Sequence, residues 1–128
     1  MIVIDTSVLI DGLTGAKLSA PAIRDAVAEG EEILLPALVL YEWLRGPRLS
    51  EELAAQESLV PSKSAIPFDT EQALVSAHLY RTVKRARTRE VDLAIAACAL
   101  VRGARLWTLN HADFRDVPGI RLYGTPRA

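Results

Sequence analysis

The sequence predicts an α/β domain in which a central, mostly parallel sheet is flanked by helices on both faces, giving three layers. Two observations favour this class. Short apolar segments alternate with amphipathic segments along almost the whole chain, as in strand–helix–strand units. The first segment, Ile2–Ile4, is wholly apolar and β-branched, which is typical of a strand buried on both faces of a parallel sheet.

The expected elements follow from this alternation. The expected strands are short and apolar, and they are residues 2–4, 33–35, 64–66, 105–109 and 120–123. The expected helices lie between capping residues, prolines and glycines, and they are residues 6–13, 21–29, 36–45, 50–58, 69–87, 89–102 and 110–115. A length of 128 residues with 50% hydrophobic content suits one buried core. We therefore expect a single domain over 1–124 and a flexible tail at 125–128.

Individual helix ends have their own signals. Asp5 can cap the first helix, and Pro21 and Pro36 suit the first turns of the second and third helices. Thr88 can cap the helix that follows it, and Gly103 can end that helix in a left-handed conformation.

Composition limits the classes of function. The formal net charge is −1, so any nucleic-acid binding must come from local charge rather than from a basic chain. The single cysteine, Cys98, excludes an intramolecular disulfide and a cysteine-based zinc site, and its apolar neighbours predict a buried, inert thiol. The N-terminus has no basic leader, and no apolar run approaches the ~20 residues of a membrane span. We expect a soluble, cytoplasmic protein without membrane contact.

Four acidic residues fall where such a fold places a site. Asp5 directly follows the first strand, and Asp113 lies just past the strand at 105–109. Glu42 and Asp92 lie on helices that can face the same edge. In parallel α/β sheets the site lies beyond the carboxyl ends of the strands, so all four carboxylates can converge there.

Converging carboxylates need a cation. They repel one another and raise one another's pKa values, and a bound divalent ion removes that penalty. Hard oxygen ligands favour Mg²⁺ or Mn²⁺ over zinc. Such an ion can activate a water molecule and offset the charge that develops on a phosphate.

Each acid also has a purely structural interpretation. Asp5 can be only an N-cap, and Asp92 can simply complement a helix dipole in a first turn. Asn110 and Asp113 have the spacing of a capping box. Glu42 is harder to explain in this way, because its helix is apolar nearly all round and a buried acid needs a partner or a metal.

Four segments together resemble the motifs of PIN-domain proteins, especially the VapC-type toxins of bacterial toxin–antitoxin pairs. They carry the four acids in the family's order, and they are residues 1–11, 42–46, 92–97 and 108–114. One stretch departs from the pattern. Family members often carry a glycine- or proline-containing turn before the third acid, and residues 85–91 contain neither.

The resemblance implies a Rossmann-like PIN fold and an endoribonuclease that depends on Mg²⁺ or Mn²⁺. It implies that four acids hold the metal and position the attacking water: Asp5, Glu42, Asp92 and Asp113. Thr6 and Asn110 would support these acids. It also implies a homodimer and a cognate antitoxin protein that inhibits the toxin.

Several alternatives stay open at the level of sequence. A basic cluster before Asp92 either grips RNA phosphates or forms a solvated helix end, and it comprises Arg81, Lys84, Arg85, Arg87 and Arg89. Leu38, Tyr41 and Leu44 can supply a dimer face, whereas Trp43 and Trp107 are expected in the core. The other candidate functions are a PIN nuclease of RNA maturation or quality control, a catalytically silent RNA- or protein-binding PIN module, and a phosphohydrolase with Asp5 as nucleophile. Ser7 disfavours the last, because it stands where that motif needs a second aspartate.

Overall fold

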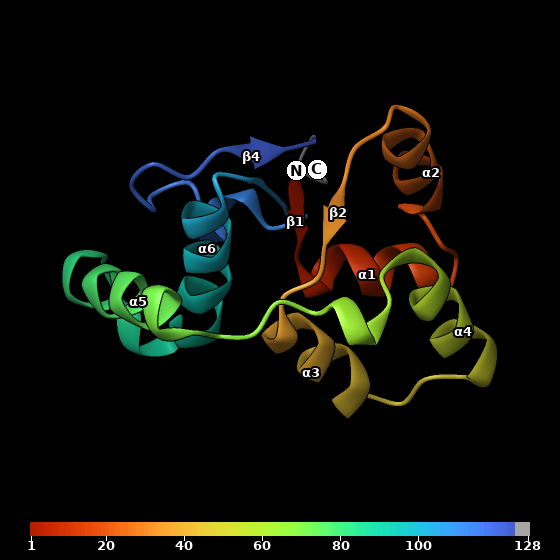
Figure 1. The fold of residues 1–128 in the computed structure, drawn as a ribbon, viewed down its shortest axis with the longest axis horizontal. Coiled ribbons are helices and arrows are strands. Elements are labelled where there is room, and N and C mark those ends of the chain that lie inside the picture. Colours follow the sequence, from red (N-terminus) through yellow and green to blue (C-terminus); the bar gives the residue numbers. More distant parts are fainter. Residues whose placement is uncertain (125–128) are drawn as a thin grey trace.

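The structure, a computed structural model, describes residues 1–124 (Figure 1). The four strands are β1 (Ile2–Ile4), β2 (Ile33–Leu34), β3 (Arg105–Trp107) and β4 (Leu122–Tyr123). The six α-helices are α1 (Thr6–Leu13), α2 (Ala20–Ala28), α3 (Ala37–Arg45), α4 (Ser50–Leu59), α5 (Thr70–Thr82) and α6 (Glu90–Arg102). Three short 3₁₀ helices are η1 (Ser62–Ser64), η2 (Ala86–Thr88) and η3 (His111–Asp113). The tail predicted at 125–128 lies outside the described residues.

The four strands form one parallel sheet in the order β2-β1-β3-β4. β1 is central, and all three of its side chains are fully buried, as its composition predicted. The chain adds β2 on one side of β1 and then crosses to add β3 on the other. The strand order therefore reverses between β1 and β3, and the carboxyl ends of these two strands flank the switch point where α/β folds bind their ligands.

Helices cover both sides of this sheet. Figure 1 shows α5 and α6 on one side, and α1, α2 and α4 on the other. α6 packs on β1 and β3 while α5 covers its outer side, so residues 93–99 are all buried. A helix enclosed in this way is apolar all round, and the alanines at most of these positions let its neighbours approach closely. This packing fixes the first turn of α6 beside the switch point.

Most predicted elements are confirmed to within a few residues, but three expectations were wrong. Residues 64–66 form no strand; 62–64 are a 3₁₀ turn, and Ile66 makes only an isolated bridge to Pro36. The long helix expected over 69–87 ends at Thr82, whose hydroxyl donates to the carbonyl of His78 at 3.0 Å and so favours the end of the helix. Thr88 does not cap α6, because its hydroxyl donates instead to the carbonyl of Arg85 at 3.1 Å.

Among residues 1–124, no helix combines the length and the hydropathy that a bilayer crossing requires. Cys98 is a buried free thiol, and burial raises its pKa to about 11, so the expectation of an inert thiol is confirmed. Trp43 and Trp107 are both in the core, as predicted.

Candidate active site

Asp5 continues β1 into the switch point. Its backbone N–H donates to the carbonyl of Trp107 at 2.9 Å, so the residue is fixed by the sheet. Its side chain is 5% exposed and accepts hydrogen bonds from the hydroxyls of Ser7 and Thr108, both at 2.8 Å. Asp5 occupies the N-cap position of α1, but within the described chain its carboxylate accepts no capping bond. The capping interpretation therefore does not explain this acid.

Ser7 and Thr108 link Asp5 to the segment that carries Asp113. The Thr108 hydroxyl, which is fully buried, accepts the backbone N–H of Asn110 at 3.1 Å. The Ser7 hydroxyl accepts the backbone N–H of Leu109, also at 3.1 Å. Sequence reasoning missed both hydroxyls as site residues, and the only signal was their place beside acids at the ends of β1 and β3.

Glu42 lies in the second turn of α3 and faces the start of α1. Its Oε1 accepts the hydroxyl of Thr6 at 2.6 Å, and its Oε2 lies 3.6 Å from Nη2 of Arg45. The structure thus places the hydroxyl of Thr6 against an acid. Asn110 differs, because its described contact with the site is made by its backbone N–H to Thr108.

Asp92 is the acid whose pKa is affected by the charges of the other three. It lies in the first turn of α6 and is half-buried, and its pKa is raised to about 6. Burial is the largest cause, the negative charges of Asp5, Asp113 and Glu42 also raise this pKa, and the Arg89 guanidinium lowers it. Asp5, Asp113 and Glu42 therefore lie near enough to Asp92 for their charges to act on it.

The donor set fits a hard divalent cation. All four acids offer carboxylate oxygens, and the pKa of Asp92 is raised first by burial and then by three neighbouring negative charges, which a cation would offset. Across residues 1–124, no group of three or more Asp, Glu, His or Cys side chains stands close enough together to hold a metal ion. Mg²⁺ is usually held by one or two carboxylates with waters and substrate phosphate.

A polar pocket of about 250 Å³ opens beside two of the acids. Its lining includes acidic, basic and hydroxyl side chains, and it comprises Arg85, Thr88, Arg89, Asp92, Ala112, Asp113 and Asp116. A phosphate needs a cation or a basic side chain, and this pocket offers Arg85 together with acids that can hold a metal.

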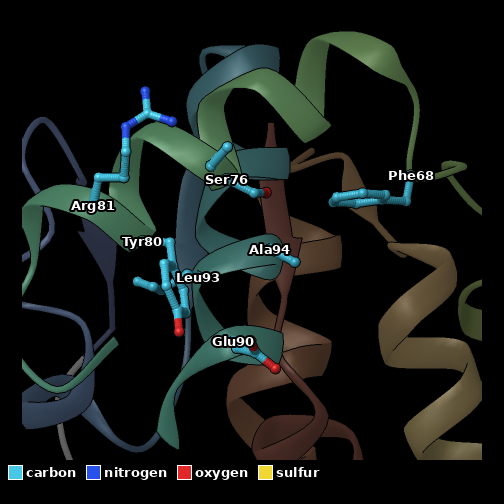
Figure 2. Close-up of a pocket in the computed structure, with 8 residues that line it drawn as sticks. Phe68, Ser76, Tyr80, Arg81, Glu90, Leu93 and Ala94 are labelled. Carbon is cyan, nitrogen blue, oxygen red and sulfur yellow. The ribbon is translucent and has the colours of Figure 1, made fainter. Parts of the chain in front are cut away.

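A second pocket, of about 380 Å³, lies between α5 and α6 and is largely apolar. It is lined by Phe68, Ser76, Ala77, Tyr80, Arg81, Glu90, Leu93 and Ala94. Figure 2 shows Arg81 and Glu90 toward opposite ends of this pocket. None of the four acids lines it, so the polar pocket is the candidate active site.

The structure divides the predicted basic cluster. Arg81 lines the apolar pocket, whose lining includes none of the four acids. Lys84, Arg85 and Arg87 are exposed on the segment between α5 and α6. Arg89 is mostly buried and forms an ion pair with Asp116, so its guanidinium is not free for RNA while that pair holds.

Arg85 makes a left-handed turn in the stretch, residues 85–91, that contains neither glycine nor proline. Its backbone is left-handed, with φ 54° and ψ 35°, a conformation that strains a side chain-bearing residue. This turn brings the chain from the end of α5 into the first turn of α6. The stretch at 85–91 therefore turns at an arginine, although it contains neither glycine nor proline.

Arg85→Gly is expected to raise the free energy of unfolding by about 1 kcal/mol, because glycine adopts this conformation without strain. Urea denaturation in EDTA measures the change. Lys17→Gly is a matched control, since Lys17 also has φ 54° but lies between α1 and α2. Destabilisation by Arg85→Gly together with stabilisation by Lys17→Gly would show that the Arg85 side chain, not its backbone, holds this segment.

Asp92 should make stability depend on pH. Its pKa is raised in the folded chain, so its contribution to stability is present below about pH 4 and is lost as the pH rises through about 6. Asp92→Asn should therefore gain clearly more stability relative to wild type at pH 7.5 than at pH 4.5, as measured by urea denaturation in EDTA. Mn²⁺ at pH 7.5 should reverse the ranking. An equal difference at both pH values would contradict the assignment.

The fold and the order of the four acids define a PIN domain. The PIN domain family model matches residues 2–120, and the chain belongs to this family. It is 32% identical over 123 residues to Ribonuclease VapC19 of Mycobacterium tuberculosis, a match that covers 94% of this chain and 98% of that protein.

Solved structures share the fold. A chain of VapBC2 from Rickettsia felis, bound to a DNA fragment from its promoter, is 20% identical with a TM-score of 0.74, and the match covers 96% of this chain and 98% of that one. A chain of DNA-bound VapBC from Salmonella typhimurium is 23% identical with a TM-score of 0.73, and the match covers 95% of this chain and 96% of that one. A chain of a toxin–antitoxin complex from Klebsiella pneumoniae is 22% identical with a TM-score of 0.71, and the match covers 99% of this chain and 98% of that one. The expected PIN-like fold is therefore confirmed.

Proposed function

We propose that this chain is a metal-dependent endoribonuclease that acts as the toxin of a toxin–antitoxin pair. The observation that carries the proposal is the placing of the acids: Ser7 and Thr108 hold Asp5 at the switch point, Thr6 holds Glu42, and Asp92 and Asp113 line one polar pocket. The charges of the other three acids also act on the pKa of Asp92. A relative named as a ribonuclease, matched over nearly the whole chain, supports the same activity.

In this proposal Asp5, Glu42, Asp92 and Asp113 hold Mg²⁺ or Mn²⁺. When bound, the cation supplies an activated water and offsets charge on the scissile phosphate. Hydroxyl side chains of the chain itself donate hydrogen bonds to two of these acids. Ser7 and Thr108 orient Asp5, and Thr6 orients Glu42, so hydrogen bonds hold these two carboxylates in place.

We propose RNA as the substrate, held by local positive charge rather than by net charge. Lys84, Arg85 and Arg87 are exposed beside the acids, and Arg85 lines the polar pocket itself. Contacts of this kind are made to phosphates, so binding should weaken as salt rises.

The partners in this proposal are a cognate antitoxin and a second copy of the chain. The titles of the similar structures name VapBC and toxin–antitoxin complexes, which supports an antitoxin. Tyr41 and Leu44 are 59% and 50% exposed on α3, and such apolar side chains favour the dimer face predicted there. Leu38 packs instead against the core. A cytoplasmic location fits an RNA substrate and a free thiol.

Cleavage of a mixed-sequence RNA by the purified chain tests the activity. We expect cleavage with Mg²⁺ or Mn²⁺, none in EDTA, and none of single-stranded DNA of the same sequence. RNA binding without cleavage would favour a silent binding module, and cleavage that persists in EDTA would reject the metal dependence.

A further inference from the structure

Arg89 lies where three segments of the candidate site meet: its backbone begins α6, and its guanidinium contacts the other two. Nη1 donates to the carbonyl of Lys84 and to Oδ2 of Asp116, both at 2.9 Å. Nη2 donates to the carbonyl of Asp113 at 2.7 Å and to Oδ1 of Asp116 at 2.6 Å. The Arg89 side chain is only 13% exposed, so most of this fork is shielded from solvent.

Each of these contacts reaches a segment that carries or precedes an acid of the site. The backbone of Arg89 opens α6, and its carbonyl accepts the N–H of Leu93 at 2.8 Å, so Asp92 lies within the turn that Arg89 begins. Asp113 lies in the short η3, outside the sheet. A segment without ladder hydrogen bonds needs another restraint if its carboxylate is to keep a fixed place.

We propose that Arg89 and Asp116 form a positioning clasp that holds the Asp113 segment against the first turn of α6, and so sets the spacing of Asp92 and Asp113 for a divalent cation. The inference rests on the proposed function. It assigns Arg89 to the organisation of the acids, where the sequence alone left open a contact with RNA phosphates or a solvated helix end. Residues that hold metal ligands in place without contacting the metal typically change metal affinity by about 10–100-fold when they are mutated.

Electrostatics and positioning predict opposite effects for one of the two residues. Arg89→Met removes a positive charge beside Asp92, so electrostatics alone predicts tighter cation binding. Asp116→Asn removes a negative charge, so electrostatics alone predicts weaker binding. A clasp predicts weaker binding in both variants, because either change opens the bidentate pair.

The chain offers a matched control at the other edge of the sheet. Arg105, which begins β3, forms an ion pair with Glu31, which precedes β2. Glu31→Gln breaks a partly buried arginine–carboxylate pair at the amino ends of the strands, away from the four acids. It should cost stability without changing cation affinity.

The experiment measures Mn²⁺ affinity by titration calorimetry at pH 7.5 in the full chain, with amide hydrogen exchange recorded in the metal-free protein. We expect Arg89→Met and Asp116→Asn each to weaken Mn²⁺ binding about 10-fold or more, and Glu31→Gln to stay within about twofold. Both clasp variants should also exchange faster at residues 110–116 than Glu31→Gln does.

The outcomes separate this inference from the proposed function. Tighter binding by Arg89→Met, or exchange at 110–116 no faster than in Glu31→Gln, would overturn the clasp while wild type still binds Mn²⁺ and cleaves RNA. A wild-type chain that binds no Mn²⁺ would reject the proposed metal site itself. A clasp variant that binds Mn²⁺ more weakly but is as thermally stable as Glu31→Gln would support positioning, because general destabilisation would lower the stability as well.

Discussion

Asp5→Asn is expected to lower RNA cleavage by about 100-fold or more while leaving the fold intact. Mutating a residue that only holds a metal ligand in place typically lowers metal affinity or activity by about 10–100-fold. Mutating a direct ligand should lower activity by at least as much. Asparagine keeps the size of Asp5 and can still accept the hydroxyls of Ser7 and Thr108, so the packing around this nearly buried residue should survive. Single-turnover cleavage in saturating Mn²⁺ measures the loss.

Two comparisons make this result specific. Thr108→Val keeps the shape of a buried side chain but removes the hydroxyl that orients Asp5, so cleavage should fall by a smaller factor of about 10. Asp25→Asn, on the exposed side of α2, should leave cleavage unchanged. Full activity in Asp5→Asn would remove this residue from the active site.

Trp43→Ala is expected to lower the free energy of unfolding by about 3–5 kcal/mol. Trp43 is fully buried on α3, next to Glu42, and its ring packs under the guanidinium of Arg48 at 4.3 Å from the ring centroid. Arg48 also donates to the carbonyl of Trp43 at 2.9 Å, so both are tied to one end of α3. Urea denaturation gives the change directly.

The neighbouring Leu44 supplies the control for this substitution. It lies on the same helix but is half exposed, so Leu44→Ala should cost less than about 1 kcal/mol in the monomer. A loss of 1 kcal/mol or less in Trp43→Ala would mean that α3 is not anchored through this side chain.

The parts of the fold that the sequence predicts well are those fixed by local composition. Ile2–Ile4 could only be a buried strand, and the wholly apolar run around Cys98 required an enclosed helix. Asp5 directly follows β1, as the sequence predicted, whereas Asp113 lies in η3, several residues beyond the end of β3. Ligands of parallel α/β sheets bind beyond the carboxyl ends of the strands, so the sequence predicts a site at that edge of the sheet.

What the sequence could not predict depends on contacts between distant residues. Thr108 lies 103 positions from Asp5, and Arg89 lies 27 positions from Asp116, so no local pattern links either pair. The end of α5 at Thr82 was also missed, because the turn that follows uses a left-handed arginine instead of glycine. Backbone strain of this kind leaves no mark in composition or periodicity.

The location of Mn²⁺ in crystals of the wild-type chain tests the central claim most directly. An anomalous difference map should show a peak among the carboxylates of Asp5, Glu42, Asp92 and Asp113, at the carboxyl ends of β1 and β3. A peak bound elsewhere, or none at a concentration that supports RNA cleavage, would contradict the account.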